Sequence, residues 1–185
     1  MIELHTPLTA EKLKDLRAGD RVLLSGTVYT ARDAAHKRML EQLDRGEPLP
    51  FDLQDATIYF VGPTPTKPGE RFGSGGPTTS GRMDRYSPAL LDLGLRAMIG
   101  KGKRDDAVKA AVVRNGAVYF GAIGGAAAVI AACVQSCEVI AYPDLGPEAV
   151  RRLEIENMEL TVILDPVGGD LYETGRAAYL QAAGK

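Results

Sequence analysis

The chain has 185 residues, of which 45% are hydrophobic and 25% charged, so we expect a folded globular protein and exclude a disordered polymer. Its 22 basic residues nearly balance 24 acidic ones, for a net charge of −2, which gives no electrostatic reason to expect nucleic acid or an anionic membrane as partner. No apolar run approaches the roughly 20 residues of a membrane span, and the first residues lack the pattern of a signal peptide. We therefore expect a single domain over residues 1–185, located in the cytoplasm.

The first half of the chain is predicted to hold two helices and two strands. The helices are expected over residues 9–18, with Thr9 as the cap, and over 31–43; the strands are expected over 21–30, with a bulge at Gly26, and over 57–61. Residues 62–80 follow with four prolines and five glycines. A loop of that length is unusual inside a compact domain and is often functional.

The second half of the chain alternates predicted helices with predicted strands. Helices are expected over residues 88–99, 106–113, 125–134 and 147–155, and strands over 118–122, 137–142 and 160–164. Such alternation is typical of the α/β class. We therefore predict a mixed, partly parallel sheet with helices packed on it.

The two cysteines, Cys133 and Cys137, exclude one kind of site. Zinc sites and iron–sulfur clusters held by one chain need three or four ligands, usually closely spaced. The two histidines, His5 and His36, are remote in sequence and do not complete such a set. We interpret the cysteines as small buried thiols and expect this chain alone to bind no metal or cluster.

Two glycine-rich segments have some features of nucleotide-binding loops but not their spacing. Residues 94–102, GLRAMIGKG, lack a Ser or Thr after Lys101, which a phosphate loop requires. Residues 121–128, GAIGGAAA, lie between a predicted strand and a predicted helix but lack the G-x-G-x-x-G order and the later acidic residue. We interpret the second segment as close packing of a helix on the sheet through small residues.

Residues 30–38, TARDAAHKR, concentrate charged side chains at a predicted strand-to-helix junction. Asp33 there favours the start of a helix, and Arg32 stands where a strand delivers side chains to a crevice. A solvated first turn with a capping aspartate explains the same residues. From this segment alone, a binding site and an ordinary surface turn are equally supported.

Residues 75–84, GGPTTSGRMD, form the second concentration of polar groups. Three consecutive hydroxyl residues are bracketed by glycines, with Arg82 and Arg85 beyond them, as in an anion-binding nest. Guanidinium groups bind carboxylates through paired hydrogen bonds, so Arg32 and Arg82 would together suit a dicarboxylate. Lys101, expected at the end of a helix, is either a third cation or a cap for helix carbonyls. The residues therefore indicate a small-anion site, with a polar turn as the alternative.

Taken together, these segments resemble the iron–sulfur (class I) fumarate hydratases. The resemblance rests on TARDAAHKR at residues 30–38, GPTTSGRMD at 76–84, KG at 101–102 and GAIGGAAA at 121–128. It covers essentially the whole chain and corresponds to the C-terminal domain of those enzymes, which is a separate β subunit in two-subunit forms. The L-tartrate dehydratase β subunit is the near relative, but Ala34, Ala35 and Gly81 make this chain more similar to the fumarases.

The resemblance implies a swivelling β/β/α fold and a hydro-lyase of the tricarboxylic acid cycle that reversibly hydrates fumarate to (S)-malate. It implies a [4Fe-4S] cluster held on three cysteines of a partner α subunit, in a hetero-oligomer such as α2β2, rather than by this chain. It places Arg32, Thr78, Arg82 and Lys101 against the dicarboxylate substrate. By the same resemblance Thr78 is the catalytic base and the three cations bind substrate, with the adjacent Thr79 as the rival base.

Two alternative functions stay open. Tartrate or mesaconate in place of fumarate would make the chain the β subunit of another dehydratase with the same chemistry. A non-catalytic module that binds a dicarboxylate and regulates a partner would need the cations but no base. A neighbouring reading frame that encodes a cysteine-bearing α subunit would distinguish the enzyme subunits from the regulatory module.

Overall fold

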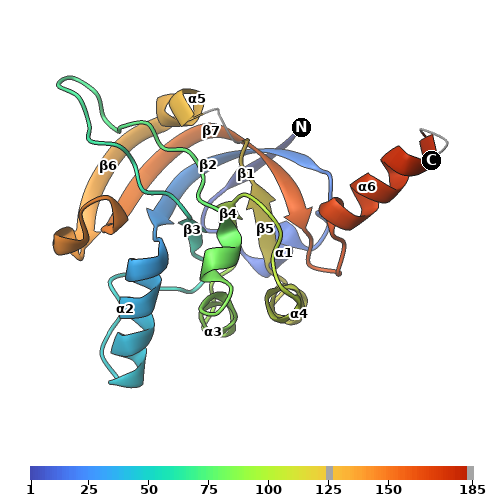
Figure 1. Ribbon diagram of the computed structural model, residues 1–185, viewed down its shortest axis with the longest axis horizontal. Coiled ribbons are helices and arrows are strands. Elements are labelled where there is room, and N and C mark those ends of the chain that lie inside the picture. The colour runs from blue at the N-terminus through green and yellow to red at the C-terminus, as the bar shows by residue number, and fades with distance from the viewer. Residues whose placement is uncertain (124–126, 183–185) are drawn as a thin grey trace.

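The computed structural model describes residues 1–123 and 127–182, in which strands and helices alternate along most of the chain (Figure 1). The elements are β1 (Ile2–His5), α1 (Ala10–Leu13), β2 (Arg21–Thr30), α2 (Asp33–Asp44), β3 (Thr57–Tyr59), the 3-10 helix η1 (Ser80–Met83), α3 (Ser87–Asp92), β4 (Ala97–Gly100), α4 (Asp106–Arg114), β5 (Val118–Gly121), α5 (Ala127–Ala132), β6 (Val134–Ala141), the 3-10 helix η2 (Pro143–Glu148), β7 (Val150–Leu164) and α6 (Leu171–Ala182). The predicted α/β class is confirmed, while the more specific swivelling β/β/α description stays a prediction. None of these helices is long and apolar enough to cross a membrane.

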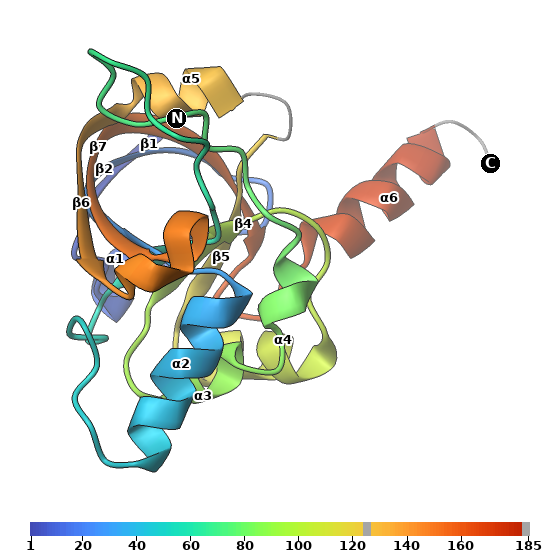
Figure 2. The ribbon, with the colours of Figure 1, turned by 60° about the vertical axis from the view of Figure 1, so that its left-hand side comes forward.

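One seven-stranded sheet organises the molecule. Strands β2, β3, β4 and β5 pair in parallel, and β7 pairs antiparallel with β5. Because β7 also pairs antiparallel with β2, the pairings run β2–β3–β4–β5–β7–β2 and close into a ring. Strand β1 extends the sheet beside β2, and β6 extends it beside β7. Figure 2 shows the curvature of these long strands.

Strand β2 is irregular at Gly26, where the sequence predicts a bulge. Its pairing register with β7 shifts between Leu24 and Gly26, and Gly26 has a φ of 106°. A Cβ at this position would lie 2.3 Å from Thr6 Oγ1, so both the backbone angle and the available space require glycine. The bulge is therefore confirmed. Along the same edge, the first half of β2 pairs with β1 and its last two residues pair with β3.

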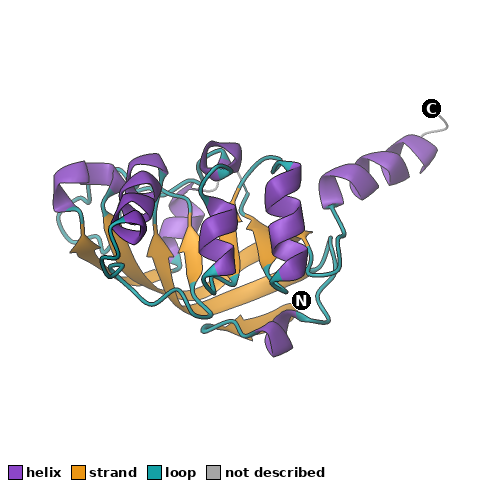
Figure 3. Cartoon of the chain, turned by 90° about the horizontal axis from the view of Figure 1, so that it is seen from below, coloured by secondary structure: helices purple, strands orange, loops and turns teal. Residues whose placement is uncertain are grey.

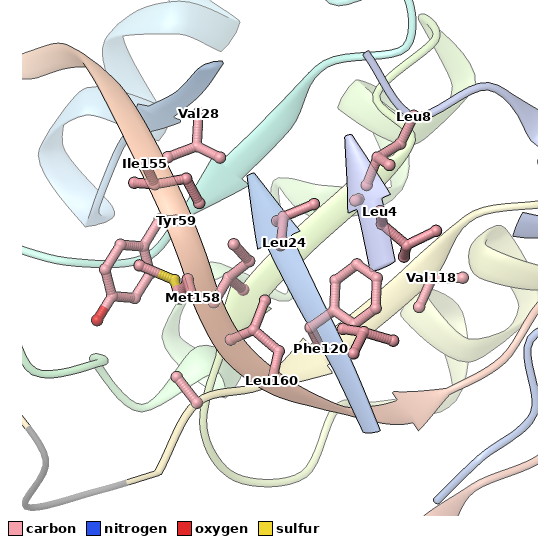
Figure 4. Packing of buried hydrophobic residues seen from close by; sticks show 14 of the residues in the cluster. Leu4, Leu8, Leu24, Val28, Tyr59, Val118, Phe120, Ile155, Met158 and Leu160 are labelled. Atoms are coloured by element: carbon pink, nitrogen blue, oxygen red, sulfur yellow. The ribbon is translucent and has the colours of Figure 1, made fainter. Parts of the chain in front are cut away.

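Buried apolar side chains form two clusters, one on each face of the sheet. The first lies inside the ring, where Figure 4 shows Leu24, Tyr59, Phe120 and Leu160 from four different strands. The second lies between the sheet and helices α2, α3 and α4, which cover its outer face (Figure 3). Its fully buried helical members are Ala35, Met39, Leu90, Leu91, Val108 and Ala111. Burial of each large apolar side chain stabilises the fold by about 1.5–3 kcal/mol.

The helix expected over residues 88–99 is wrong in its second half. Helix α3 ends at Asp92, Gly94 has a φ of 109°, and β4 follows with all four of its residues buried. An apolar run of four residues does not distinguish a buried strand from a helix by periodicity. Pairing with β3 on one side and β5 on the other makes this run a strand. Lys101 therefore follows a strand, not a helix.

The helix expected over residues 147–155 is also wrong. The 3-10 helix η2 ends at Glu148, and one long strand, β7, then includes the strand expected over 160–164. The physical reason is tertiary: β7 pairs with β2 along one edge and with β5 and β6 along the other. Pairing on both edges outweighs the local preference for helix.

The other expected elements agree with the structure apart from their ends. The helix expected over 9–18 is shorter, but Thr9 caps α1 as predicted, its Oγ1 accepting from the Lys12 N–H at 3.4 Å. Helix α5 is the observed part of the helix expected over 125–134. Gly125 and Ala126 lie outside the described residues, and Val134 is the first residue of β6. Strand β1 and helix α6 were not predicted.

A buried ion pair joins two loops behind the carboxyl ends of the parallel strands. The Arg104 side chain is 0% exposed, and its Nε donates to Asp84 Oδ1 at 2.5 Å. Its Nη2 lies 2.7 Å from Ser87 Oγ, and its guanidinium stacks over the rings of Phe60 and Tyr119 at 5.3 and 5.0 Å. The pair thus fixes the end of the GRMD segment against the residues that follow Lys101.

We expect Arg104→Met to lower the free energy of unfolding by about 3–5 kcal/mol, because it leaves the Asp84 carboxylate buried without its counter-charge. Arg114→Met is the matched control, since Arg114 and its partner Asp92 are each 47% exposed. Exposed pairs contribute about 1 kcal/mol or less. Urea denaturation of both variants measures the difference, and equal losses would contradict a structural role for the buried pair.

Candidate functional site

The segments that follow the parallel strands gather at one edge of the sheet (Figure 1). Arg32 comes two residues after the end of β2, and Lys101 comes directly after β4. After β3 the chain makes its long loop and returns, so that the Thr78 N–H donates to the Phe60 carbonyl at 2.7 Å. In parallel α/β sheets, both open and closed, ligands bind at the carboxyl ends of the strands. The structure therefore places the predicted site residues at a location suited to binding.

The GPTTSGRMD segment is held to Lys101 by backbone pairing. Thr79 and Lys101 form a parallel β-bridge, and the Ser80 N–H donates to the Lys101 carbonyl at 2.8 Å. In return, the Lys101 N–H donates to Ser80 Oγ at 3.0 Å. Thr78 is half-buried, whereas the side chains of Thr79 and Lys101 are exposed. Two segments about twenty residues apart in sequence thus form one rigid unit.

The Ser80 hydroxyl is buried and belongs to a chain of hydrogen bonds that ends at the partly buried Gly102. The Tyr119 hydroxyl lies 2.9 Å from Ser80 Oγ and 3.0 Å from the Gly102 carbonyl oxygen. Because a phenol has one proton, all groups are satisfied when Ser80 donates to Tyr119 and Tyr119 donates to Gly102. A Cβ on Gly100 would lie 1.9 Å from Ser80 Oγ, so this chain requires glycine there. Ser80 is one of the three consecutive hydroxyl residues, but no sequence pattern predicts its contact with Tyr119.

The Arg32 side chain lies in a narrow slot. Its Nη2 is 3.2 Å from Glu148 Oε1, and a Cβ on Gly62 would lie 2.7 Å from its Nη1 and 3.2 Å from the Pro147 carbonyl oxygen. The side chain is 23% exposed, so one end of the guanidinium still reaches solvent. Its Nε is buried and has no hydrogen-bond partner among the described residues. The slot restricts Arg32 to few positions.

Arg82 reaches back to the start of helix α2. Its Nε donates to Asp33 Oδ1 at 3.0 Å, and its Nη2 lies 2.5 Å from Asp33 Oδ2. Asp33 is the first residue of α2, two residues later than the predicted start of this helix, and directly follows Arg32. The two arginines are thereby brought to the same part of the edge. With Arg82 53% exposed, this ion pair is accessible to a competing anion.

The chemistry of this edge suits a small organic dianion. Arg32, Arg82 and Lys101 supply three cations, and guanidinium groups match the geometry of carboxylates. Asp33 and Glu148 balance two of these cations inside the protein. These side chains do not line the cavity of about 500 Å³ beside α5 or the cavity of about 420 Å³ beside α4.

His36 lies beneath the same edge and is fully buried. Its Nδ1 is 2.9 Å from the Arg32 carbonyl oxygen, and its ring packs against Phe60 and Tyr86. Burial lowers the pKa of His36 to about 4; the hydrogen bond to Arg32 opposes this shift, and the nearby Arg104 adds to it. The ring is therefore neutral at pH 7, and Nδ1–H donates to the Arg32 carbonyl. Sequence analysis gave His36 no structural role, although its i+4 spacing from Arg32 is a usable signal.

The cysteines do not provide a cluster site. Cys133 and Cys137 are both half-buried, and burial raises the pKa of each thiol, which opposes the thiolate form that binds metals. Among the described residues, no three His, Cys, Asp or Glu side chains gather closely enough to hold a metal ion. The residues present therefore do not fit an iron–sulfur cluster.

Comparison with known proteins finds one family model and several relatives. The model described as "Fumarase C-terminus" matches residues 1–175. The class I aerobic fumarate hydratase of Salmonella typhimurium is 37% identical over 186 residues, covering 98% of this chain and 32% of the relative. Fumarate hydratase 2 of Leishmania major is 38% identical, with coverages of 92% and 31%. A candidate L(+)-tartrate dehydratase subunit beta of Methanocaldococcus jannaschii is 40% identical, with coverages of 90% and 88%. The chain thus spans about a third of the fumarate hydratases it matches.

The low pKa of His36 predicts a pH dependence of stability. Between about pH 6.5 and pH 4 the unfolded chain binds a proton at this residue and the folded chain does not, so stability falls as the pH falls through this range. Between pH 7 and about pH 4.5 the free energy of unfolding of the wild type should fall by about 2–3 kcal/mol more than that of His36→Phe. Urea denaturation at both pH values measures this. Parallel losses in the two proteins would show that other groups cause the acid sensitivity.

Proposed function

Because this chain belongs to the Fumarase C-terminus family, we propose that it is the β subunit of a heteromeric hydro-lyase that reversibly hydrates fumarate to (S)-malate. The relatives named as fumarate hydratases are hydro-lyases, and the tartrate dehydratase beta relative is matched over 88% of its own length, which supports a separate subunit. The observation that carries the proposal is the placement of Arg32, Thr78, Arg82 and Lys101 around one edge of the sheet.

In this proposal the three cations bind the two substrate carboxylates. Arg82 is the most accessible guanidinium, and a substrate carboxylate would exchange with Asp33 for its paired donors. Arg32 is held in its slot and presents a fixed donor, while Lys101 contributes a flexible ammonium from a rigid backbone position. Two carboxylates on one small molecule would thus meet donors from three different segments.

Thr78 is proposed as the base that removes the C3 proton of malate. A threonine hydroxyl is a weak base unless its alkoxide is stabilised, and nearby cations provide that stabilisation. Thr78 is half-buried and its backbone is fixed to Phe60, so its hydroxyl is held in position in a partly desolvated setting. Thr79 is the rival, but its side chain is exposed. In the reverse direction Thr78 returns the proton to fumarate.

The cofactor and the partner are proposed together. The described residues of this chain do not fit a [4Fe-4S] cluster, so we assign the cluster to a partner α subunit, with α2β2 as the expected assembly. The exposure of Arg82 and Lys101 supports a site that is completed by another chain. A cytoplasmic location goes with this proposal.

A tartrate dehydratase subunit is the second candidate, and the 40% identity to the Methanocaldococcus jannaschii protein favours it. A mesaconate hydratase subunit has the same chemistry. A regulatory dicarboxylate-binding module is the third candidate, and it would leave Thr78 without a task. Side-by-side assays of fumarate, tartrate and mesaconate distinguish the first two candidates, and activity on any of them excludes the third.

We expect Thr78→Ala to lower kcat by about 10²–10⁴-fold, the usual contribution of a positioned acid–base group, while malate still binds. Thr79→Ala is the matched control and should keep most of the activity. The measurement is steady-state kinetics of the reconstituted complex, together with malate titration. Similar losses in both variants would sink the assignment of the base to Thr78.

The isolated chain is expected to fold but to be colourless and inactive, because its described residues offer no cluster ligands. Anaerobic co-expression with a cysteine-bearing α subunit should produce a brown complex that turns over a dicarboxylate. Circular dichroism, iron analysis and the three assays test both statements. A brown, active preparation of this chain alone, after treatment with iron and sulfide, would refute the proposal that the site is shared between two subunits.

A further inference from the structure

We propose that Glu148 is a positioning residue that holds the Arg32 guanidinium at the edge of the site and at the same time caps helix α2. One of its carboxylate oxygens faces Arg32 and the other faces the first turn of the helix. This inference rests on the proposed function only in taking Arg32 as a substrate-binding group. Glu148 does not touch the substrate in this account and acts through Arg32.

The start of α2 needs a cap from outside its own segment. Arg32 is the N-cap residue, and its side chain makes no capping hydrogen bond. The free N–H of Ala34 instead donates to Glu148 Oε2 at 3.0 Å, across 114 residues of sequence. An anionic acceptor at a helix N-terminus is also favoured by the helix dipole. Glu148 therefore fixes the direction in which the chain leaves β2 and enters α2.

The second oxygen of Glu148 determines where the guanidinium lies. Glu148 Oε1 is 3.2 Å from Arg32 Nη2, and the two side chains are 21% and 23% exposed, so the pair is partly desolvated. Gly62 lies against the same side chain, where a Cβ would be 2.7 Å from Arg32 Nη1 and 3.1 Å from its Cδ. The Arg32 backbone is fixed as well, because the N–H and the Nδ1 of His36 both contact its carbonyl at 2.9 Å. Arg32 is thus restrained at both ends.

Glu148 can do this because it stands on a rigid turn. The Arg151 guanidinium donates to the carbonyls of Gly146, Pro147 and Ala149 at 2.9, 3.0 and 3.1 Å. Asp144 in the same 3-10 helix binds Arg38 of α2 through two hydrogen bonds of 2.8 Å. Figure 2 shows this turn beside the amino end of α2. Arg151 therefore holds the turn together, and the Arg38–Asp144 pair joins the turn to α2.

Glu148→Gln separates the two roles of the side chain. The glutamine oxygen still accepts from the Ala34 N–H, so the cap is kept. The amide NH2 would then face the Arg32 guanidinium, and because both groups are hydrogen-bond donors, the contact with Arg32 would be lost. Asp144→Asn is the matched control, because Asp144 lies in the same turn and binds an arginine outside the site. If Glu148 were only a cap, Glu148→Gln would behave as this control does.

The first test uses the full chain alone. 15N relaxation measures the order parameter of the Arg32 Nε–H bond, and the resonance is assigned by its absence in Arg32→Lys. In the wild type this order parameter should be typical of a rigid group. It should fall below about 0.6 in Glu148→Gln and stay at the wild-type value in Asp144→Asn. An unchanged order parameter in Glu148→Gln would overturn the proposal. This readout needs neither partner nor activity, so it is independent of the proposed function.

The second test uses the reconstituted complex. Glu148→Gln should raise KM for the dicarboxylate about tenfold and change kcat by less than about threefold. In an Arg32→Met background the same substitution should add no further loss, because the group it positions is gone. A tenfold rise that persists in that background would overturn the proposal. An inactive wild-type complex would instead count against the proposed function, and the relaxation experiment would still decide the role of Glu148.

Discussion

Parallel strands carry their carboxyl ends to the same edge of a sheet, and here four strands, β2 to β5, do so side by side. Every group of the candidate site depends on that pairing. Arg32 lies two residues after β2, Lys101 directly follows β4, and Thr78 hydrogen-bonds to the residue that follows β3. Strand β7 keeps the edge in place, because it pairs with both outer members of the set and so closes the ring.

Gathering three cations at one edge is electrostatically unfavourable, and the protein offsets this with its own carboxylates. Asp33 binds the exposed Arg82, and Glu148 binds the half-buried Arg32. The two pairs differ in accessibility, which suggests different tasks. The Arg82 pair can exchange with an incoming carboxylate, whereas the Arg32 pair sits in a slot and serves to hold its guanidinium in position. The neutral His36 beneath them adds no further positive charge at neutral pH.

Much of the fold and of the site is predictable from the sequence. Apolar periodicity identifies strand β2 and helix α2, and the glycine at position 26 marks the bulge in the pairing of β2 with β7. The residue types in TARDAAHKR and GPTTSGRMD predict a small-anion site before any contact is known. The errors fall where a short apolar run is ambiguous, as in Ala97–Gly100, or where long-range pairing outweighs local preference, as in Val150–Leu164.

By itself, then, the sequence determined the α/β class, the family and the identities of the candidate site residues, because these depend on local periodicity and on motifs within nine or ten residues. Only the tertiary structure decided that Tyr119 and Ser80 support Lys101, and that Glu148 reaches α2 across 114 residues. Such contacts join segments that have no shared periodicity. They exist because the closed ring of strands brings the segments together, and a linear pattern carries no signal of that closure.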